Sequence, residues 1–361
     1  MTKIWLDCDP GHDDATAIML AIHCPGIELL GVSTVHGNTS VDNTTVNAAR
    51  CLVAFGASHH VKVYPGAVKP LIRLPRYDPE IHGESGIEGV EGLPDGNDPR
   101  VRERLVHADG TVRAIEGLAR AVHASWLHGN GEKIVVISTG PMTNIALFVS
   151  VYPELLVGIE EFVFMGGGVG MGNRSSAAEF NILCDPEACQ IVLDAPLKKT
   201  MIPLNVTHTA IVTKSVHASI LSPGMPLETS RVVSTITNAA TPLRHMLSTL
   251  LTFFADSYKM VFGFHDGPPL HDALTIAYVY KPELFNSKRY RVDVELSGTH
   301  TSGETVVDIW NYRKCDDSWG PNGRNCMIAE KLDVHEFFTA FLECIAEADK
   351  VSPLNMEKPN I

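Results

Sequence analysis

The sequence predicts an α/β protein with an open, mostly parallel, Rossmann-like sheet and helices on both faces. Short apolar runs rich in β-branched residues alternate along the chain with longer stretches of helical periodicity. Strands separated by helices are typical of a parallel sheet, whose crossover helices cover both faces. The length of 361 residues, with 45% hydrophobic and 20% charged residues, allows the large core that such a sheet needs.

The first elements form two strand–helix units. The stretch KIWLDC predicts a strand that ends at Asp9, a Pro-Gly pair turns the chain, and DDATAIMLAIH predicts a helix over 13–23. A second strand over 28–34 and a helix over 43–56 follow. Ligands of parallel sheets bind beyond the carboxyl ends of the strands, and Asp9 lies at such an end.

The rest of the chain continues this alternation. A long helical region is expected from about Glu228 to Phe264, and an amphipathic helix over 333–350 precedes a loose tail over 351–361. Further strands are predicted over 61–64, 133–139, 160–165 and 199–204, with a later pair over 291–296 and 305–310.

We expect a single domain over residues 1–350, interrupted by one unusual segment. Residues from about 73 to 104 are dense in Gly, Pro and acidic side chains. A loop of this length inside a compact domain is uncommon and is often functional. Because it contains His82, we expect it to form a lid over a site.

The charge balance argues against polyanionic partners. There are 29 Lys and Arg against 42 Asp and Glu, a formal net charge of −13, which repels nucleic acid and anionic lipid. The N-terminus reaches acidic residues too early for a signal peptide, and no apolar run approaches a membrane span. The eight cysteines are scattered without a C-x-x-C pair and fit reduced thiols. We expect a cytoplasmic protein that binds neither nucleic acid nor membranes.

The stretch LDCDPGHDDA places four carboxylates, Asp7, Asp9, Asp13 and Asp14, within eight positions. Two like charges about 4 Å apart repel by roughly 4 kcal/mol at an effective dielectric of about 20. A helix N-terminus offers only about half a compensating charge, and the next cation after the cluster is Arg50. Oxygen ligands without clustered His or Cys suit a hard cation, Ca²⁺ or Mg²⁺, and irregular coordination favours Ca²⁺.

Two other interpretations of this stretch are open. One is an Asp that caps the helix beside solvated neighbours, with no metal. The other is an aspartyl-phosphate phosphatase, which also begins with a strand and D-x-D. Such phosphatases usually have Thr or Val where this chain has Gly11, so the metal interpretation is favoured.

Polar residues at other predicted strand and helix ends complete a candidate site. His271 and Asp272 follow a Gly-Pro-Pro turn at the start of a helix, and the Thr139 carbonyl ends a strand. After a run of three glycines, donors and acceptors suited to sugar hydroxyls follow at Asn173, Glu179 and Asn181.

These features indicate hydrolysis at a sugar carbon. The chain lacks the glycine patterns that bind nucleotide phosphates. A hard metal would lower the pKa of a water, one carboxylate would take its proton, and an acid would assist the leaving group. Two such roles around an oxocarbenium-like transition state are typical of glycoside hydrolysis.

Seven motifs stand in an order that resembles a known family. They are DCDPGHDDA, VSTVHGN, IHGESG, STGPMTNIA, MGGG, AEFN and HDA, and together they span nearly the whole chain. The chain resembles the nucleoside hydrolases of the inosine-uridine-preferring type, and among these the fungal uridine ribohydrolases. The resemblance implies the nucleoside hydrolase fold.

The resemblance also implies a role for each matching residue. Asp9, Asp14, Asp272 and the Thr139 carbonyl would hold Ca²⁺; Asp9 would be the general base, and His271 the acid for the leaving base. Asp7 would support the site. The substrate-binding residues would be Asp13, Asn38 and Asn181 for the 2′- and 3′-hydroxyls, Asn173, Glu179 and the Met165 backbone for the 5′ side, and His82, His271 and Tyr258 near the base.

The implied activity is Ca²⁺-dependent hydrolysis of ribonucleosides, of uridine or inosine type, to ribose and free base. Two alternatives stay open: a purine-preferring nucleosidase, and a non-catalytic nucleoside- or ribose-binding protein. Phe254 stands where the protozoan pattern has a second tyrosine, and the IHGESG loop lacks the tryptophan of the purine-specific branch. The preferred base is therefore left open. The family commonly forms dimers or tetramers, so a homodimer or homotetramer is expected.

Overall fold

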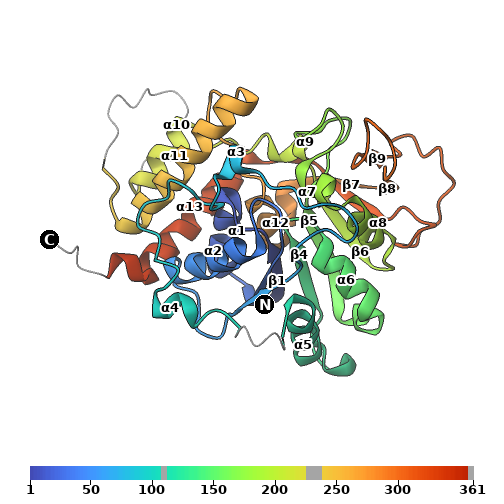
Figure 1. The fold of residues 1–361 in the computed structure, drawn as a ribbon, viewed down its shortest axis with the longest axis horizontal. Coiled ribbons are helices and arrows are strands. Elements are labelled where there is room, and N and C mark those ends of the chain that lie inside the picture. Colours follow the sequence, from blue (N-terminus) through green and yellow to red (C-terminus); the bar gives the residue numbers. More distant parts are fainter. Residues whose placement is uncertain (107–111, 225–237, 357–361) are drawn as a thin grey trace.

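The computed structural model describes residues 1–106, 112–224 and 238–356. A sheet lies at its centre (Figure 1). It has eight strands in the order β3-β2-β1-β4-β5-β6-β10-β7. Its strands run parallel except at the β10–β7 edge, so the predicted open, mostly parallel sheet is confirmed. The strands are β1 (Thr2–Cys8), β2 (Ile27–Thr34), β3 (Val63–Pro65), β4 (Ile134–Ser138), β5 (Ile159–Met165), β6 (Lys198–Ile202), β7 (Phe285–Tyr290) and β10 (Cys326–Leu332).

The central strand β1 shows how the sequence sets the layers. Because neighbouring side chains of a strand point to opposite faces, Ile4 enters the core on one side of the sheet and Trp5 the core on the other. Strands β2 and β4 flank β1 in a register that places Asp7 beside Ser33 and Ser138. The carboxyl ends of three strands therefore meet at one edge of the sheet.

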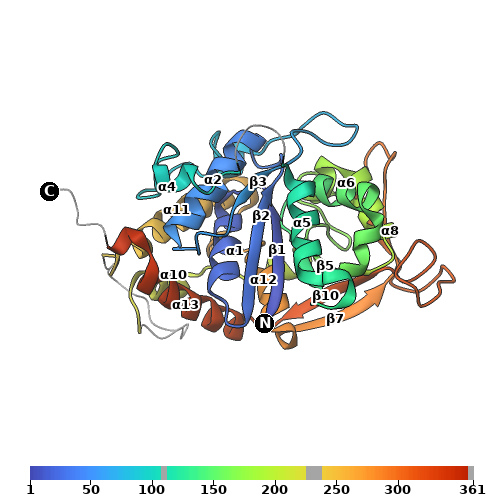
Figure 2. The ribbon, with the colours of Figure 1, turned by 90° about the horizontal axis from the view of Figure 1, so that it is seen from below.

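Helices cover both faces of the sheet, as Figure 2 shows. The layer that shares a core with Ile4 contains α1 (His12–His23), α2 (Val41–Ala54), α9 (Leu204–Thr207), α10 (Lys214–Leu221), α11 (Pro242–Phe262), α12 (Ala273–Tyr280) and α13 (Val334–Val351). The opposite layer contains α5 (Ala114–Trp126), α6 (Thr143–Val151), α7 (Phe180–Cys184) and α8 (Pro186–Asp194). The remaining short helices are α3 (Pro79–His82), α4 (Pro99–Arg102) and the 3₁₀ turns η1 (Leu127–Gly129), η2 (Pro153–Gly158), η3 (Pro282–Leu284) and η4 (Pro353–Asn355).

The late strands differ from the sequence prediction. The expected pair exists as β8 (Val292–Val294) and β9 (Thr305–Val307), which form a separate antiparallel sheet. Strands β7 and β10 were not predicted. The sequence of β7, FNSKRY, is polar because it lies at the sheet edge, and its pairing with β10 joins segments far apart in the chain.

The predicted helix over 228–264 is found over a shorter range. Helix α11 begins after Thr241, whose hydroxyl accepts a hydrogen bond from the Arg244 amide, and Pro242 occupies its first turn. It ends at Gly263, whose φ of 74° suits glycine. Residues 238–241 precede the helix, and the predicted part over 228–237 lies outside the described residues.

The lid-like segment over 73–104 carries α3 and α4 and is held to the body of the protein. Arg73 pairs with Glu187 at 2.7 Å, and α3 packs against α11. Part of the expected loose tail is also packed: the buried Ser352 hydroxyl donates to the Ala54 carbonyl at 2.7 Å. Residues 357–361 lie outside the described residues.

Two further sequence expectations bear on the environment of the chain. Within the described residues, no helix is both long and apolar enough to cross a bilayer. All eight cysteines are free thiols, as predicted, including Cys24 and Cys344, whose sulfurs lie 3.6 Å apart.

Candidate active site

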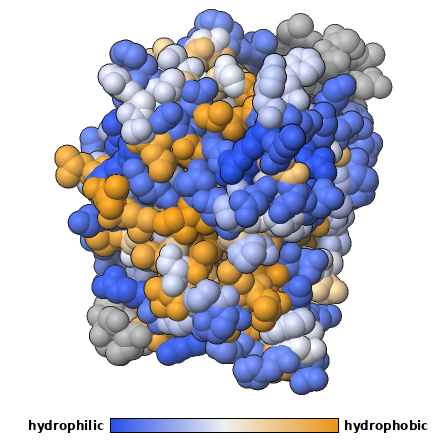
Figure 3. All heavy atoms as spheres, turned by 90° about the vertical axis from the view of Figure 1, so that its right-hand side faces the viewer, coloured by the Kyte–Doolittle hydropathy of each residue, from blue (hydrophilic) through white to orange (hydrophobic). Residues whose placement is uncertain are grey.

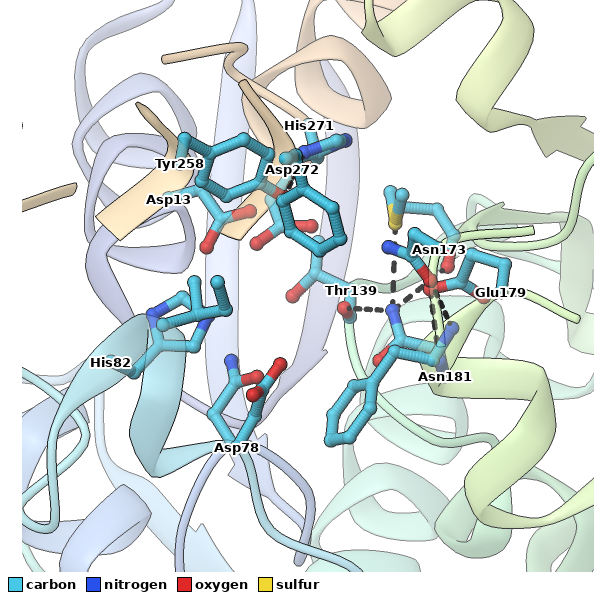
Figure 4. Close-up of a pocket in the computed structure, with 15 residues that line it drawn as sticks. Asp13, Asp78, His82, Thr139, Asn173, Glu179, Asn181, Tyr258, His271 and Asp272 are labelled. Atoms are coloured by element: carbon cyan, nitrogen blue, oxygen red, sulfur yellow. Dashed lines mark hydrogen bonds between the residues drawn. The ribbon is translucent and has the colours of Figure 1, made fainter. Parts of the chain in front are cut away.

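A pocket opens at the carboxyl ends of the central strands (Figure 4). Asp13 follows β1, Thr139 follows β4 and Met165 ends β5, which is where ligands bind in parallel sheets. The pocket is lined by Asp13, Asn38, Asp78, Ile81, His82, Thr139, Met165, Asn173, Glu179, Phe180, Asn181, Tyr258, Phe262, His271 and Asp272.

Three buried carboxylates meet at this pocket. One oxygen each of Asp13, Asp14 and Asp272 lies within 4.8 Å of the others. Asp13 and Asp14 belong to the first turn of α1, and Asp272 is the N-cap of α12. Helices from distant parts of the sequence thus aim their N-terminal residues at one point. Three carboxylate oxygens could hold a metal ion there.

Asp9 lies beside this cluster, and only one of its two carboxylate oxygens has a hydrogen-bond donor within the described part of the chain. Its Oδ2 accepts a hydrogen bond from the Asn38 amide at 2.7 Å, while its buried Oδ1 meets no donor among the described residues. Gly37 and Gly140 approach the carboxylate so closely that a Cβ on either would overlap it. A buried carboxylate oxygen without a donor is costly, and a cation would relieve that cost.

The predicted ligand set and the observed cluster differ in one member. The prediction names Asp9 with Asp14, Asp272 and the Thr139 carbonyl, whereas Asp13 is the residue that meets Asp14 and Asp272 most closely. Asp14 accepts the Thr139 hydroxyl at 2.7 Å, whereas the Thr139 carbonyl, which is the predicted ligand, accepts the Asn181 side-chain amide at 2.8 Å.

Burial dominates the electrostatics of these acids. It raises the pKa of Asp9, Asp14 and Asp272 above the ordinary value, and repulsion from Asp14 and Asp13 adds to the rise for Asp9 and Asp272 respectively. Burial and repulsion from Asp14 raise the pKa of Asp13 to about 8. The free cluster therefore tends to hold protons, which a cation would displace.

Asp7 does not line the pocket, and its hydrogen bonds connect the ends of neighbouring strands. Its Oδ1 accepts hydrogen bonds from the Ser33 hydroxyl at 2.5 Å and the Asn144 amide at 2.8 Å. Burial raises its pKa to about 7. These contacts join β1, β2 and α6, in line with the supporting role predicted for Asp7.

Amide and carboxylate groups line the opposite side of the pocket, where Figure 4 shows Asn173, Glu179 and Asn181 together. The Asn181 side chain donates to the carbonyls of Thr139 at 2.8 Å and Met165 at 3.3 Å. Glu179 accepts backbone N–H bonds, and burial raises its pKa to about 7 against their opposing effect. This side of the pocket matches the hydrogen-bonding needs of a sugar.

The third side of the pocket is aromatic and carries His271. Its Nε2 lies 2.7 Å from the Tyr258 hydroxyl, and its Nδ1 lies 2.7 Å from the Thr207 hydroxyl. Burial lowers the pKa of His271 and raises that of Tyr258, so both are neutral near pH 7. The sequence indicated His271 and Tyr258, but not Thr207.

His82 reaches the pocket from α3 and contacts a second histidine. Its Nδ1 lies 3.2 Å from both the backbone nitrogen and the ring Nδ1 of His12. Nε2 of His12 lies 3.0 Å from the Glu88 carbonyl, so it donates there when the ring is neutral. Phe253 and Phe254 stack on His12, which fixes its ring plane.

The pocket therefore brings together every residue predicted to bind substrate. It also contains residues that the sequence did not indicate: Asp78, Ile81, Phe180 and Phe262 line it, and His12, Arg174 and Thr207 support the lining. The available signal among these was membership of the quoted motifs, which contain His12 (DCDPGHDDA), Ile81 (IHGESG) and Phe180 (AEFN).

Comparison with known proteins identifies the family. The profile of the inosine-uridine preferring nucleoside hydrolases matches residues 4–339. The chain belongs to this family. It is 34% identical over 348 residues to a probable ribonucleoside hydrolase of Dictyostelium discoideum, covering 96% of this chain and 94% of that protein. It is 40% identical over 309 residues to the pyrimidine-specific ribonucleoside hydrolase RihA of Shewanella woodyi, covering 85% and 89%.

A solved structure supports the same assignment for this nucleoside hydrolase. The purine-preferring ribonucleoside hydrolase of Gardnerella vaginalis superposes with a TM-score of 0.79 and 27% identity, over 97% of this chain and 100% of that one. The predicted family and fold are confirmed. The chain is thus an enzyme that hydrolyses small-molecule ribonucleosides, and the alternative of a non-catalytic binding protein is set aside.

Proposed function

We propose that this nucleoside hydrolase cleaves the N-glycosidic bond of uridine- and inosine-type ribonucleosides with the help of Ca²⁺. The observation that carries the proposal is a buried carboxylate cluster at a pocket with sugar-binding polar groups on one side and histidines on another. Sugar, base and metal each have a matching surface in this arrangement.

The acidic cluster supports a hard divalent cation. Asp9, Asp14, Asp272 and the Thr139 carbonyl offer oxygen atoms only, and the free Oδ1 of Asp9 needs a partner. Bound Ca²⁺ would neutralise the carboxylates and lower the pKa of a nearby water. Asp9 would then be the base that takes the proton of that water.

The polar side of the pocket orients the ribose in this proposal. Asp13, Asn38 and Asn181 bind the 2′- and 3′-hydroxyls, while Asn173, Glu179 and the Met165 backbone bind the 5′ side. These groups supply both hydrogen-bond donors and acceptors, as a sugar edge requires. Holding the anomeric carbon next to Asp9 makes the attack effectively intramolecular.

The histidine side receives the base. Of the two histidines, His271 is proposed as the proton donor to the departing base, because the contacts of Tyr258 and Thr207 with its ring nitrogens fix its orientation at the pocket. His82 faces the other edge of the base from α3. The segment over 73–104, which carries His82, is proposed to act as a lid that excludes water.

We propose a preference for pyrimidine nucleosides as the first candidate. The support is the 40% identity to a protein named pyrimidine-specific. A purine-preferring enzyme is the second candidate, because the solved structure at TM-score 0.79 is named purine-preferring. A panel of uridine, cytidine, inosine, adenosine, guanosine and nicotinamide riboside separates the two by their kcat/KM values.

The reaction itself is tested by release of reducing sugar from uridine and inosine. Chelation of divalent ions, or the Asp9→Asn variant, is expected to abolish release, and added Ca²⁺ is expected to restore it only in the wild type. Full turnover by Asp9→Asn, or in the presence of chelator, would contradict the proposed mechanism.

We also propose a cytoplasmic homodimer or homotetramer. Figure 3 shows apolar side chains gathered over the face that carries β8 and β9. In the segments that follow β8 and β9, the exposed side chains include Leu296, Ile309, Trp310 and Tyr312, with 78% exposure for Trp310 and 88% for Tyr312. Such side chains suit burial between subunits. Light scattering measures the state, and a Trp310→Ser, Tyr312→Ser variant is expected to shift it toward the monomer.

A further inference from the structure

An ion pair between Asp78 and Arg174 joins two loops that line different parts of the pocket. Nε of Arg174 lies 3.0 Å from Oδ2 of Asp78, and Nη2 contacts Oδ1, so the pair is bidentate. The side chains are 10% and 17% exposed. A bidentate pair shielded from water is more specific in geometry and stronger than an ordinary surface pair.

The carboxylate of Asp78 is free for this contact because it does not cap a helix. An Asp at an N-cap usually accepts amide hydrogens with its side chain, but α3 begins without such a bond. Instead, the Asp78 carbonyl accepts from the amides of Ile81 and His82 at 3.1 Å, and the Asp78 amide donates to the Asn38 carbonyl at 3.1 Å. The backbone of Asp78 thus sets the place of His82.

Arg174 is bound just as firmly into the opposite loop. Its amide donates to the Ala178 carbonyl at 3.2 Å, and its guanidinium lies 5.5 Å from the centre of the Phe262 ring. The neighbouring Asn173 accepts the Phe180 amide with its side chain at 2.9 Å. A displacement of Arg174 would therefore reach the residues that line this side of the pocket.

We propose that Asp78 and Arg174 are positioning residues that hold His82 and the 173–180 loop in a fixed relation across the bound nucleoside. The inference rests on the proposed function, in which His82 contacts the base and Asn173 and Glu179 bind the 5′ side of the ribose. With the ion pair intact, binding of the 5′-hydroxyl in its correct position favours binding of the base in its correct position, and the reverse also holds.

Hydrogen exchange of the free enzyme tests the mechanical part of this proposal without any substrate. In Asp78→Asn and in Arg174→Gln, peptides covering 78–88 and 172–180 are expected to exchange faster together, about tenfold. The matched control is Lys198→Gln, which breaks the 2.9 Å pair with Glu161, whose side chains are 38% and 10% exposed and lie outside both the pocket lining and the 73–104 segment. The control is expected to leave both peptides unchanged.

Kinetics test the substrate part. The ratio of kcat/KM for uridine to that for 5′-deoxyuridine measures how much the 5′-hydroxyl contributes. We expect either single variant to lower this ratio about tenfold, mostly through KM, and the double variant to lower it no further, since contacting residues are not additive. Arg174→Lys keeps the charge and is expected to recover part of the ratio. A purely structural role would lower the melting temperature and leave the ratio unchanged.

The outcomes separate this inference from the proposed function. If the wild type releases no ribose from any nucleoside but the two peptides still respond together, the proposed function fails and the mechanical coupling stands. The inference is overturned if hydrogen exchange rises only in the loop that carries the substitution. It is also overturned if an active enzyme keeps its ratio of kcat/KM for uridine to that for 5′-deoxyuridine and the effects of the two substitutions are additive.

Discussion

The hydroxyl of Tyr258 lies 2.7 Å from Nε2 of His271, and both side chains are buried. The contact joins the last turns of α11 to the start of α12, which are separated by a turn rich in Gly and Pro. It fixes the orientation of the His271 ring, which lines the pocket. The following prediction depends on it.

Removal of His271 is expected to slow the enzyme according to the leaving group. His271→Ala should lower kcat on uridine by about 100-fold or more, in the range typical of a lost general acid. On 4-nitrophenyl riboside, whose leaving group needs little protonation, the loss should stay below about tenfold. Steady-state assays of both substrates make the comparison, and equal losses would exclude His271 as the acid.

Calcium titration calorimetry is expected to distinguish Asp9 from Asp13. Asp9 and Asp13 each have a buried Oδ1 without a donor among the described residues, but Asp9 is proposed as a ligand and Asp13 is proposed to bind the ribose. Asp9→Asn should weaken Ca²⁺ binding about 100-fold, and Asp13→Asn by less than about tenfold while raising KM. The opposite order would move Asp13, which contacts Asp14 and Asp272 closely, into the ligand set.

The stabilisation by calcium is expected to grow with pH. Burial raises the pKa of Asp14 and Asp272, and that of Asp13 to about 8, above the ordinary value near 4. Without metal, these groups favour folding at low pH and lose that contribution as pH rises toward 8, because the folded state must then hold bare charges. Ca²⁺ needs the deprotonated form.

Melting temperatures measured with CaCl₂ and with chelator at pH 5, 6, 7 and 8 check this expectation. The difference between the two conditions should increase steadily over that range. A difference that is constant or shrinks with pH would show that protons and calcium do not compete at the cluster.

Gly140 is expected to tolerate no side chain. A Cβ there would overlap Oδ1 of Asp9, the atom proposed to face the cation. Gly140→Ala should therefore lower calcium affinity and kcat by about 100-fold or more, through displacement of the Asp9 carboxylate. Gly320→Ala serves as the control, because a Cβ there meets its nearest atom only at 3.9 Å. Similar activity of both variants would count against the proposed place of Asp9.

Much of the fold could be predicted because its signals are local. Strand β1 and helix α1 follow from a short apolar run, a Pro-Gly turn and a helical pattern, and all three lie within the first 23 residues. The edge strand β7 could not be predicted from its polar sequence, since only its pairing with the distant β10 makes it a strand. The start of α11 was placed too early because helical periodicity alone does not mark a boundary.

The candidate site divides in the same way. Asp9, Asp13 and Asp14 lie within six consecutive positions of the sequence. Their mutual repulsion, and the cation that would relieve it, could therefore be predicted from the sequence alone. The hydrogen-bonding groups of Asn173 indicated sugar binding, but its predicted 5′ role and the predicted role of Tyr258 near the base came from family likeness. Arg174 gave no signal, because a single arginine in a loop is usually a surface residue.

The sequence alone was enough for the α/β class, the acidic character of the site and the family, because periodicity, charge spacing and motif order are all written along the chain. The folded structure was needed to show that Asp272 closes on Asp13 and Asp14, that His12 meets His82, and that Asp78 pairs with Arg174. These contacts join residues many positions apart, and their distances depend on how the sheet and its helices pack, which no local pattern encodes.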